Sequence, residues 1–292
     1  MVTHHFWKGC GTAVVTPFLE DGSVDYDSYA RLLDRQVEAG VDFICLLATT
    51  AEAPTLSLEE RKKMFAIARE HCAGLPLMVG CGSNSIPATL ENIRQLPGAD
   101  AYLVIVPFYN KPTQEGMYLY FKEIAQAAPA PVIMYNVPGR TGVNMLASTA
   151  LRIAREVPNV VGTKEASGDL RQCMEIIEGA PQGFSVLSGD DDMTFDIIRA
   201  GGHGVVSVAS NVLPVELTRM THLALEGHLQ EAGSLNEALM PLMKGCFLES
   251  NPIPVKAALA QLGLCDARMR LPLTEASEST KESLREILKA WK

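Results

Sequence analysis

Short apolar segments alternate with amphipathic stretches along almost the whole chain. Eight of these segments are four to six residues long, and most are rich in Val, Ile and Leu without interposed polar positions. Continuous apolar runs of this length are typical of parallel strands that are buried on both faces. We predict strands at residues 12–16, 43–48, 77–81, 101–106, 132–136, 160–164, 185–188 and 204–208.

The stretches between these segments have the periodicity and the end signals of helices. In the first stretch, Asp25 is a candidate N-cap and Gly40 follows the last apolar position. In the second, Ser57 and Glu60 have the spacing of a capping box. Eight successive strand–helix units predict a (β/α)₈ TIM barrel, for which about 250 residues are typical.

An open doubly wound sheet is the alternative arrangement of alternating strands and helices. That fold usually carries a glycine-rich dinucleotide-binding turn after its first strand. Here the first strand runs into PFLEDG (17–22), so we prefer the closed barrel, over residues 1–227. Residues 228–292 have helical periodicity throughout, and we expect C-terminal helices that pack on the barrel as an extension. The last of them would bury one face, which includes Leu284 and Leu288.

Composition and charge narrow the class of protein. The chain has 292 residues, 47% of them hydrophobic, and a formal net charge of −9. It therefore has no broad cationic surface, and we expect neither nucleic acid nor a membrane as a partner. The seven cysteines are scattered, which is typical of reduced thiols in the cytoplasm. Residues 1–8, with His4 and His5, lack the apolar core of a signal peptide, and no run approaches the ~20 residues of a membrane span.

Reactive side chains occur at the predicted C-terminal ends of strands, where barrel enzymes have their active sites. Lys164 ends the sixth strand, and Tyr135 lies in the neighbouring fifth strand. An amine must be neutral to attack a ketone, and burial favours the neutral amine. A phenol beside the resulting imine can pass protons. Taken singly, a lysine at a solvated loop and a tyrosine that serves packing are the commoner interpretations, so the combination carries the hypothesis.

Three further groups lie at the same strand ends. Thr49 and Thr50 follow the second strand, where β-propensity and capping are the alternative explanation. Tyr109 lies in the loop after the fourth strand, and could equally be a surface residue. Arg140 lies in a tight turn after the fifth strand, where a guanidinium suits bidentate binding of a carboxylate. An arginine that simply faces solvent is the alternative.

Asp190, Asp191 and Asp192 follow the seventh strand. Three carboxylates could hold a divalent cation in a metal-dependent aldolase, but no His or Glu ligand set accompanies them. We interpret them as caps of the helix that runs through Phe195 and Arg199. The six histidines show no metal-ligand spacing. We therefore expect neither a metal site nor a cofactor.

Eight short motifs occur in order along nearly the whole chain. They are GTAVVTPF (11–18), ATTAE (48–52), PFYNKPTQEG (107–116), YNVPGRTG (135–142), GTKEASGD (162–169), LSGDD (187–191), GGHGVVSV (201–208) and NPIPVKAAL (251–259). Each motif is weak alone, but the ordered set resembles the dihydrodipicolinate synthase / N-acetylneuraminate lyase family of pyruvate-dependent class I aldolases. The YNVPGRTG and NPIPVKAAL stretches are typical of members that condense pyruvate with L-aspartate-4-semialdehyde.

The resemblance implies a catalytic set. Lys164 would form an imine with pyruvate, and Thr49, Tyr135 and Tyr109 would form a proton relay. Tyr109 would reach in from a partner subunit, so the resemblance also implies a homo-oligomer, either a dimer or a tetramer.

The resemblance implies substrate-binding residues as well. Thr50 would bind the carboxylate of pyruvate, and Arg140 would bind the carboxylate of L-aspartate-4-semialdehyde. Gly189 and Val206 would bound the site through backbone groups. The implied product is 4-hydroxy-tetrahydrodipicolinate, an intermediate of lysine biosynthesis.

One motif departs from the family pattern. Ala48 and Ala51 stand in ATTAE where the family more often has the glycines of GTTGE. If those glycines had positive φ angles, alanine would be costly there; a permissive loop would accept it.

Three other functions stay open. The first is another aldolase of the same family, acting on a sialic acid, a 2-keto-3-deoxy sugar acid or 4-hydroxy-2-oxoglutarate. The second is a catalytically idle binding module, and the third is a metal-dependent aldolase.

The resemblance also carries an expectation about regulation. Lysine-sensitive members bind lysine through polar side chains after the GTTGE motif and beside the relay tyrosine. The residues of this chain in that region are Ala53, Leu58, Arg61, Asn84 and Phe108. Because most of them offer no matching polar group, we expect L-lysine to inhibit weakly or not at all.

Overall fold

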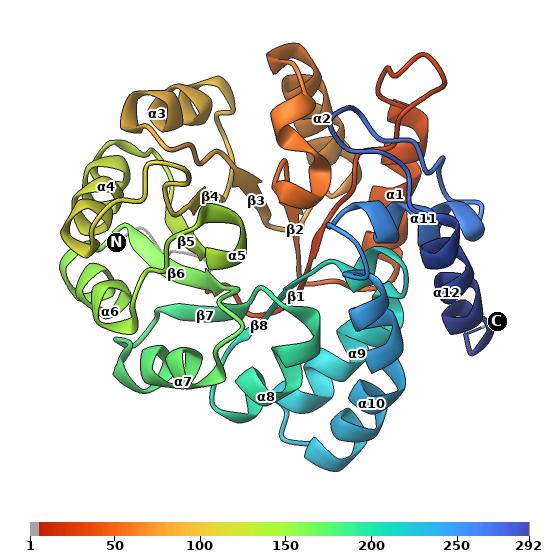
Figure 1. Cartoon of the computed structure of the whole chain (residues 1–292). Helices are drawn as coiled ribbons and strands as arrows, with labels where there is room; N and C mark the ends of the chain where they lie inside the picture. Colours follow the sequence, from red (N-terminus) through yellow and green to blue (C-terminus); the bar gives the residue numbers. More distant parts are fainter. Residues whose placement is uncertain (1–5, 292) are drawn as a thin grey trace.

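The computed structural model describes residues 6–291 and contains a closed barrel of eight parallel strands (Figure 1). Each strand pairs with the next in the sequence, and β8 pairs with β1 to close the ring. The predicted TIM barrel is confirmed, whereas His4 and His5 lie outside the described residues. The strands are β1 (Gly9–Ala13), β2 (Phe43–Leu46), β3 (Leu77–Gly80), β4 (Ala101–Ile105), β5 (Val132–Asn136), β6 (Val160–Glu165), β7 (Ser185–Ser188) and β8 (Gly204–Ser207).

The first strand begins three residues earlier than its apolar run predicts, at Gly9 instead of Thr12. Gly11 pairs with Phe43 of β2, and a Cβ atom on Gly11 would lie 2.0 Å from the Phe43 ring. The strand therefore needs a glycine where a search for apolar runs looks for a large side chain. The other seven strands overlap their predicted ranges, and their ends differ by two residues at most.

An outer ring of helices covers the strands (Figure 1). The N-cap of α1 is Asp25, which accepts a hydrogen bond from the backbone of Ser28, and Ser57 and Glu60 form the predicted capping box of α2. Both predicted helix starts are confirmed. The outer helices are α1 (Tyr26–Glu38), α2 (Leu58–His71), α3 (Ile86–Gln95), α4 (Gln114–Ala127), α6 (Ala147–Glu156), α7 (Leu170–Gly179), α8 (Thr194–Arg199) and α9 (Pro214–Leu225).

Apolar side chains fill the inside of the barrel below its C-terminal mouth. Trp7 and Phe43 pack edge to face there, with ring centroids 5.2 Å apart, and Met78 and Leu187 belong to the same buried cluster. A TIM barrel is a packed core, not a pore. The open space available to a ligand therefore lies at the mouth, where the strands end.

The C-terminal segment contains α10 (Leu229–Gly245), α11 (Ile253–Gln261) and α12 (Glu278–Lys289). Leu284 and Leu288 of α12 are buried, as predicted for its apolar face. The prediction of helix throughout is wrong for residues 263–277, which form no helix. Gly263 has a φ of +71° at the end of α11, and Pro272 lacks the N–H that a helix requires. No helix within residues 6–291 combines the length and apolarity of a membrane span.

Candidate active site

Lys164 lies near the end of β6 with 4% of its surface exposed. It pairs in register with Tyr135 of β5, and its Nζ atom lies 4.4 Å from the centroid of the Tyr135 ring. Neighbouring residues of a strand point to opposite faces, so both side chains point into the barrel while Glu165 points outward. The structure therefore brings together the predicted nucleophile and the predicted proton carrier, out of bulk water.

Gly189, directly after β7, lies against the lysine. A Cβ atom at this position would be 3.1 Å from Cε of Lys164 and 2.6 Å from Cβ of Ala166. A larger residue would therefore clash with Ala166 and press on the lysine side chain. Val206 of β8 is fully buried in the cluster inside the barrel that also contains Tyr135. Both residues therefore lie near the predicted catalytic pair.

The two threonines lie in a single 3-10 turn, η1 (Thr49–Ala51), after β2. Ala48 precedes the turn in an extended conformation, and the positive φ angles belong to Leu47 and Glu52, at +54° and +53°. Since neither alanine of ATTAE needs a glycine conformation, the loop accepts the departure from the family pattern.

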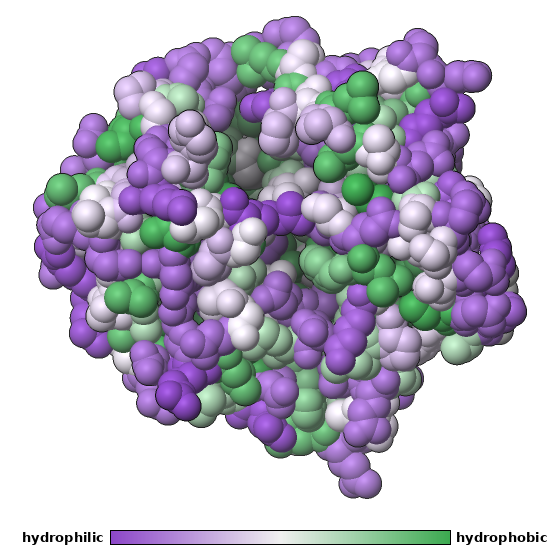
Figure 2. Space-filling view, in the orientation of Figure 1, coloured by the Kyte–Doolittle hydropathy of each residue, from purple (hydrophilic) through white to green (hydrophobic). Residues whose placement is uncertain are grey.

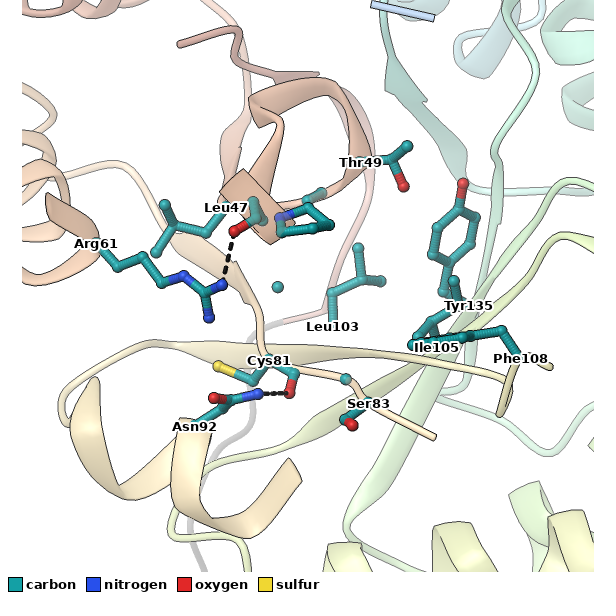
Figure 3. A pocket seen from close by; sticks show the side chains of 15 residues that line it. Leu47, Thr49, Arg61, Cys81, Ser83, Asn92, Leu103, Ile105, Phe108 and Tyr135 are labelled. Atoms are coloured by element: carbon teal, nitrogen blue, oxygen red, sulfur yellow. Dashed lines mark hydrogen bonds between the residues drawn. The ribbon is translucent and has the colours of Figure 1, made fainter. Parts of the chain in front are cut away.

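The hydroxyl groups of this turn have different surroundings. Figure 3 shows the hydroxyls of Thr49 and Tyr135 pointing toward one another at one end of a cavity. Thr50 is buried, and its Oγ1 accepts a hydrogen bond of 3.0 Å from Nδ2 of Asn251. Thr49 is thus available to a proton relay, while the position of Thr50 is set by a residue from the C-terminal segment.

Arg140 lies in the short helix α5 (Pro138–Thr141), which is inside the ring of outer helices, beside the barrel mouth (Figure 1). Its side chain is exposed, and Nη2 donates a hydrogen bond of 3.0 Å to the backbone carbonyl of Asn251. Asn251 therefore contacts both Thr50 and Arg140. Sequence reasoning assigned this asparagine no role, although it begins the NPIPVKAAL motif.

Tyr109 lies in the loop between β4 and α4, with 89% of its surface exposed and a φ of +71°. A positive φ is uncommon for a residue with a bulky side chain, and such strain persists only where the surrounding structure imposes it. The ring lies on the surface of its own chain, apart from the buried pair of Lys164 and Tyr135.

The aspartates after β7 do not cap the helix that the sequence predicts. The helix α8 has Met193 as its N-cap and no side-chain cap, because the 3-10 turn η3 (Asp191–Met193) intervenes and turns Asp191 inward. Oδ2 of Asp191 accepts hydrogen bonds from the backbone N–H groups of Val208 and Ala209, at 2.9 and 3.0 Å. This carboxylate therefore caps the turn after β8, and the prediction for α8 is wrong.

Two carboxyl groups in the neighbourhood of the site have raised pKa values. Burial raises the pKa of Asp190 to about 6, although the nearby Lys164 ammonium opposes the shift. Burial also raises the pKa of Glu165 to about 7, and this side chain accepts a 2.8 Å hydrogen bond from Asn136 behind the strands. Sequence reasoning missed both environments because they depend on burial. Within residues 6–291, no group of three or more His, Cys, Asp or Glu side chains is arranged to hold a metal ion.

A cavity of about 310 Å³ opens at the barrel mouth. Thr49 and Tyr135 line one end of it, and Arg61 and Asn92 line the other, as the close view in Figure 3 shows. Nη2 of Arg61 donates a 2.6 Å hydrogen bond to the carbonyl of Ala53. The space-filling view shows a hollow with apolar residues inside and polar residues around it (Figure 2).

The geometry of the candidate active site agrees with the comparison of this sequence with known protein families. The sequence model of the dihydrodipicolinate synthetase family matches residues 7–291. This chain belongs to that family. A 4-hydroxy-tetrahydrodipicolinate synthase of Phocaeicola vulgatus is 46% identical over 288 residues, which are 98% of this chain and 97% of the relative. The resemblance inferred from the eight motifs is confirmed.

Solved structures of the dihydrodipicolinate synthetase family match the fold closely. Dihydrodipicolinate synthase from Thermotoga maritima is 45% identical, with a TM-score of 0.96 and 98% of each chain covered. A chloride-inhibited dihydrodipicolinate synthase from Acinetobacter baumannii, complexed with pyruvate, is 40% identical, with a TM-score of 0.94. That comparison covers 97% of this chain and 98% of the other.

Proposed function

We propose that this protein catalyses the condensation of pyruvate with L-aspartate-4-semialdehyde to 4-hydroxy-tetrahydrodipicolinate in lysine biosynthesis. The observation that carries the proposal is the buried amine of Lys164, which lies 4.4 Å from the Tyr135 ring at the barrel mouth. Membership of the dihydrodipicolinate synthetase family, whose relatives bear the matching name, supports the same activity.

The proposed reaction begins at Nζ of Lys164. The neutral amine attacks the ketone carbon of pyruvate, and loss of water from the carbinolamine gives an imine. Loss of a proton from the methyl carbon gives an enamine, whose carbon attacks the aldehyde of the second substrate. This addition regenerates the imine. The amino group of the second substrate then attacks the imine carbon, which closes the ring and displaces the amine of Lys164. The hydroxyls of Tyr135 and Thr49 carry the protons of these steps.

Each carboxylate has a proposed binding group at the mouth. Thr50 binds the carboxylate of pyruvate, and Arg140 binds that of the semialdehyde. A guanidinium has five N–H donors, so the single bond from Arg140 to Asn251 leaves donors for a bidentate contact. Gly189 leaves room around Lys164, and Val206 bounds the site within the buried cluster that contains Tyr135.

An aldehyde panel tests the proposal directly. With pyruvate present, L-aspartate-4-semialdehyde should give the highest kcat/KM, and the cyclic product should be detected by mass spectrometry. The same enzyme should be assayed for cleavage of a sialic acid, a 2-keto-3-deoxy sugar acid and 4-hydroxy-2-oxoglutarate. A higher kcat/KM for any of these three would reassign the enzyme to another aldolase activity of the same family.

We infer further that the active enzyme is a homo-oligomer, a dimer or a tetramer, in which Tyr109 completes the relay of a neighbouring subunit. The 89% exposure and strained backbone of Tyr109 support this inference. All seven cysteines are free and six are buried, which supports a reducing cytoplasmic location. Mixing inactive Tyr109→Phe and Lys164→Ala variants should restore some activity, because one hybrid site receives both intact residues.

The complementation experiment needs a control for mixing. Subunit exchange should be demonstrated by native mass spectrometry of differently tagged variants. Tyr118→Phe, on the buried side of α4, is the matched control. Mixed with Lys164→Ala, it should give the same activity as wild type mixed with Lys164→Ala. Exchange without recovery of activity would contradict the shared site.

L-Lysine at millimolar concentration should inhibit this enzyme weakly or not at all. The cavity that Ala53 and Phe108 help to line also presents the guanidinium of Arg61, which repels an ammonium group. Loss of two polar contacts weakens binding by roughly a hundredfold at about 1.4 kcal/mol for each factor of ten. Initial rates and thermal unfolding should be measured across a lysine series. Sub-millimolar inhibition accompanied by thermal stabilisation would refute the expectation.

A further inference from the structure

The ATTAE turn is attached to the C-terminal segment by a buried ion pair. Nζ of Lys256, in α11, lies 2.9 Å from Oε1 of Glu52, and both side chains are completely inaccessible to solvent. The other carboxylate oxygen of Glu52 accepts a 3.1 Å hydrogen bond from the backbone N–H of Arg270. Lys256 also donates to the carbonyl of Arg268. The ammonium and the carboxylate therefore have partners beyond each other.

Glu52 has an unfavourable backbone conformation directly beside the threonines. Its φ is +53°, and its N–H donates a 3.0 Å hydrogen bond to the carbonyl of Thr49, which closes the 3-10 turn. A left-handed conformation at a residue with a side chain persists only when surrounding contacts impose it. The two bonds that the carboxylate accepts, from Lys256 and Arg270, are contacts of that kind.

The same part of the chain holds Thr50 from a second direction. Asn251, which precedes the N-cap Pro252 of α11, donates to the Thr50 hydroxyl, and Lys256 lies within α11 itself. Arg270 reaches from residues 263–277 to α2, where it pairs with Glu60. A movement of α11 relative to the barrel would thus move both the hydroxyl of Thr50 and the carboxylate of Glu52, the residue whose N–H closes the turn.

We propose that Glu52 and Lys256 are positioning residues, whose buried ion pair holds Thr49 and Thr50 in the geometry needed to bind pyruvate and form the imine. Neither residue contacts the substrate in this proposal. A charge left alone in this interior would draw water or a counterion into the turn, because an unpaired buried charge is strongly destabilising. Thr50 and Thr49, which are two and three residues before Glu52, would then lose their alignment. The inference rests on the proposed imine chemistry at Lys164.

Three variants separate a positioning role from a role in stability alone. Lys256→Met keeps the length of the side chain and removes its charge, and Glu52→Gln keeps an oxygen that can accept from Arg270. The double variant Glu52→Gln/Lys256→Met leaves no unpaired charge. Lys281→Met is the matched control, because Lys281 forms ion pairs within the same C-terminal segment without contacting the turn.

Each variant is compared with wild type by its KM for pyruvate, its kcat and its rate constant for imine formation. Borohydride trapping counts the competent sites, so rates are expressed per trapped site, and thermal unfolding is measured in parallel. Each single variant should lose about tenfold to a hundredfold in kcat/KM for pyruvate, mainly through KM. The double variant should recover part of the loss, and Lys281→Met should match wild type.

The result that would overturn the proposal is a lower unfolding temperature with unchanged pyruvate KM and imine rate per site in the single variants. If Lys256→Met does not fold, Glu52→Gln and the double variant decide by the same criterion. A wild-type enzyme that forms no pyruvate adduct would instead overturn the proposed function. The two failures are therefore distinguishable.

Discussion

Borohydride added together with pyruvate should inactivate the enzyme and leave a single mass adduct, on Lys164. Lys164 is the buried amine at the barrel mouth, and the Tyr135 ring beside it keeps it out of bulk water. Lys164→Ala should form no adduct and should lose at least about a thousandfold in kcat, because no other group replaces a covalent nucleophile. Peptide mapping after reduction identifies the modified residue.

The chain provides an internal control for this experiment. Lys256 is also buried, but its ammonium is paired with Glu52 and its side chain is completely inaccessible to solvent. If burial alone made a lysine reactive, Lys256 would take up the adduct as well. An adduct on Lys256 or on an exposed lysine, or none at all, would contradict the assignment of Lys164. Borohydride without pyruvate should leave the activity unchanged.

The positions at strand ends were the part of the site most accessible from sequence. Parallel strands of a barrel all end at one rim, so residues that follow successive apolar runs must lie near each other. Lys164 and Tyr135 come from neighbouring strands, and their register places them side by side. Small errors in strand bounds had no effect on this inference, because it depends on the order of the strands and not on their exact length.

Errors arose where a contact outside the local pattern decides the structure. Gly11 of β1 is required by the Phe43 ring of the next strand, and Gly9 by the side chain of Asp42, which no search along a single segment can detect. Asp191 is a residue type that often caps helices, but its carboxylate accepts a hydrogen bond from the backbone N–H of Val208, 17 residues away. Local propensity describes what a segment can do, whereas tertiary contacts select among the options.

Contacts from the C-terminal segment were also beyond prediction from periodicity. Asn251 meets Thr50 across 201 residues, and Lys256 meets Glu52 across 204. A lysine within the apolar run of NPIPVKAAL was a usable signal, since a charge is seldom fully buried unless it is paired. The sequence could indicate that Lys256 needs a partner, but only the fold identifies the partner as Glu52. The segment predicted as an extension is therefore part of the structure that supports the site.

Arg140→Ala should reduce kcat/KM for L-aspartate-4-semialdehyde by about a hundredfold or more, chiefly by raising the KM for that substrate. A charge-assisted bidentate contact is among the stronger hydrogen-bonding arrangements, and alanine removes both bonds. Pyruvate binds at Lys164 and Thr50 in the proposed mechanism, so the yield of the trapped adduct with pyruvate alone should largely survive. Steady-state kinetics with the semialdehyde varied, together with borohydride trapping, measures the two effects separately.

Two further variants make the Arg140 experiment specific. Arg140→Lys retains a positive charge but not the planar fork, so it should recover only part of the loss if bidentate geometry matters. Arg285→Ala, on the exposed surface of α12, should behave as wild type. Because Arg140 also donates to the carbonyl of Asn251, its loss could disturb Thr50 through that residue. Pyruvate trapping distinguishes the cases: lost trapping with an unchanged semialdehyde KM would mean that Arg140 supports the pyruvate site and does not bind the second substrate.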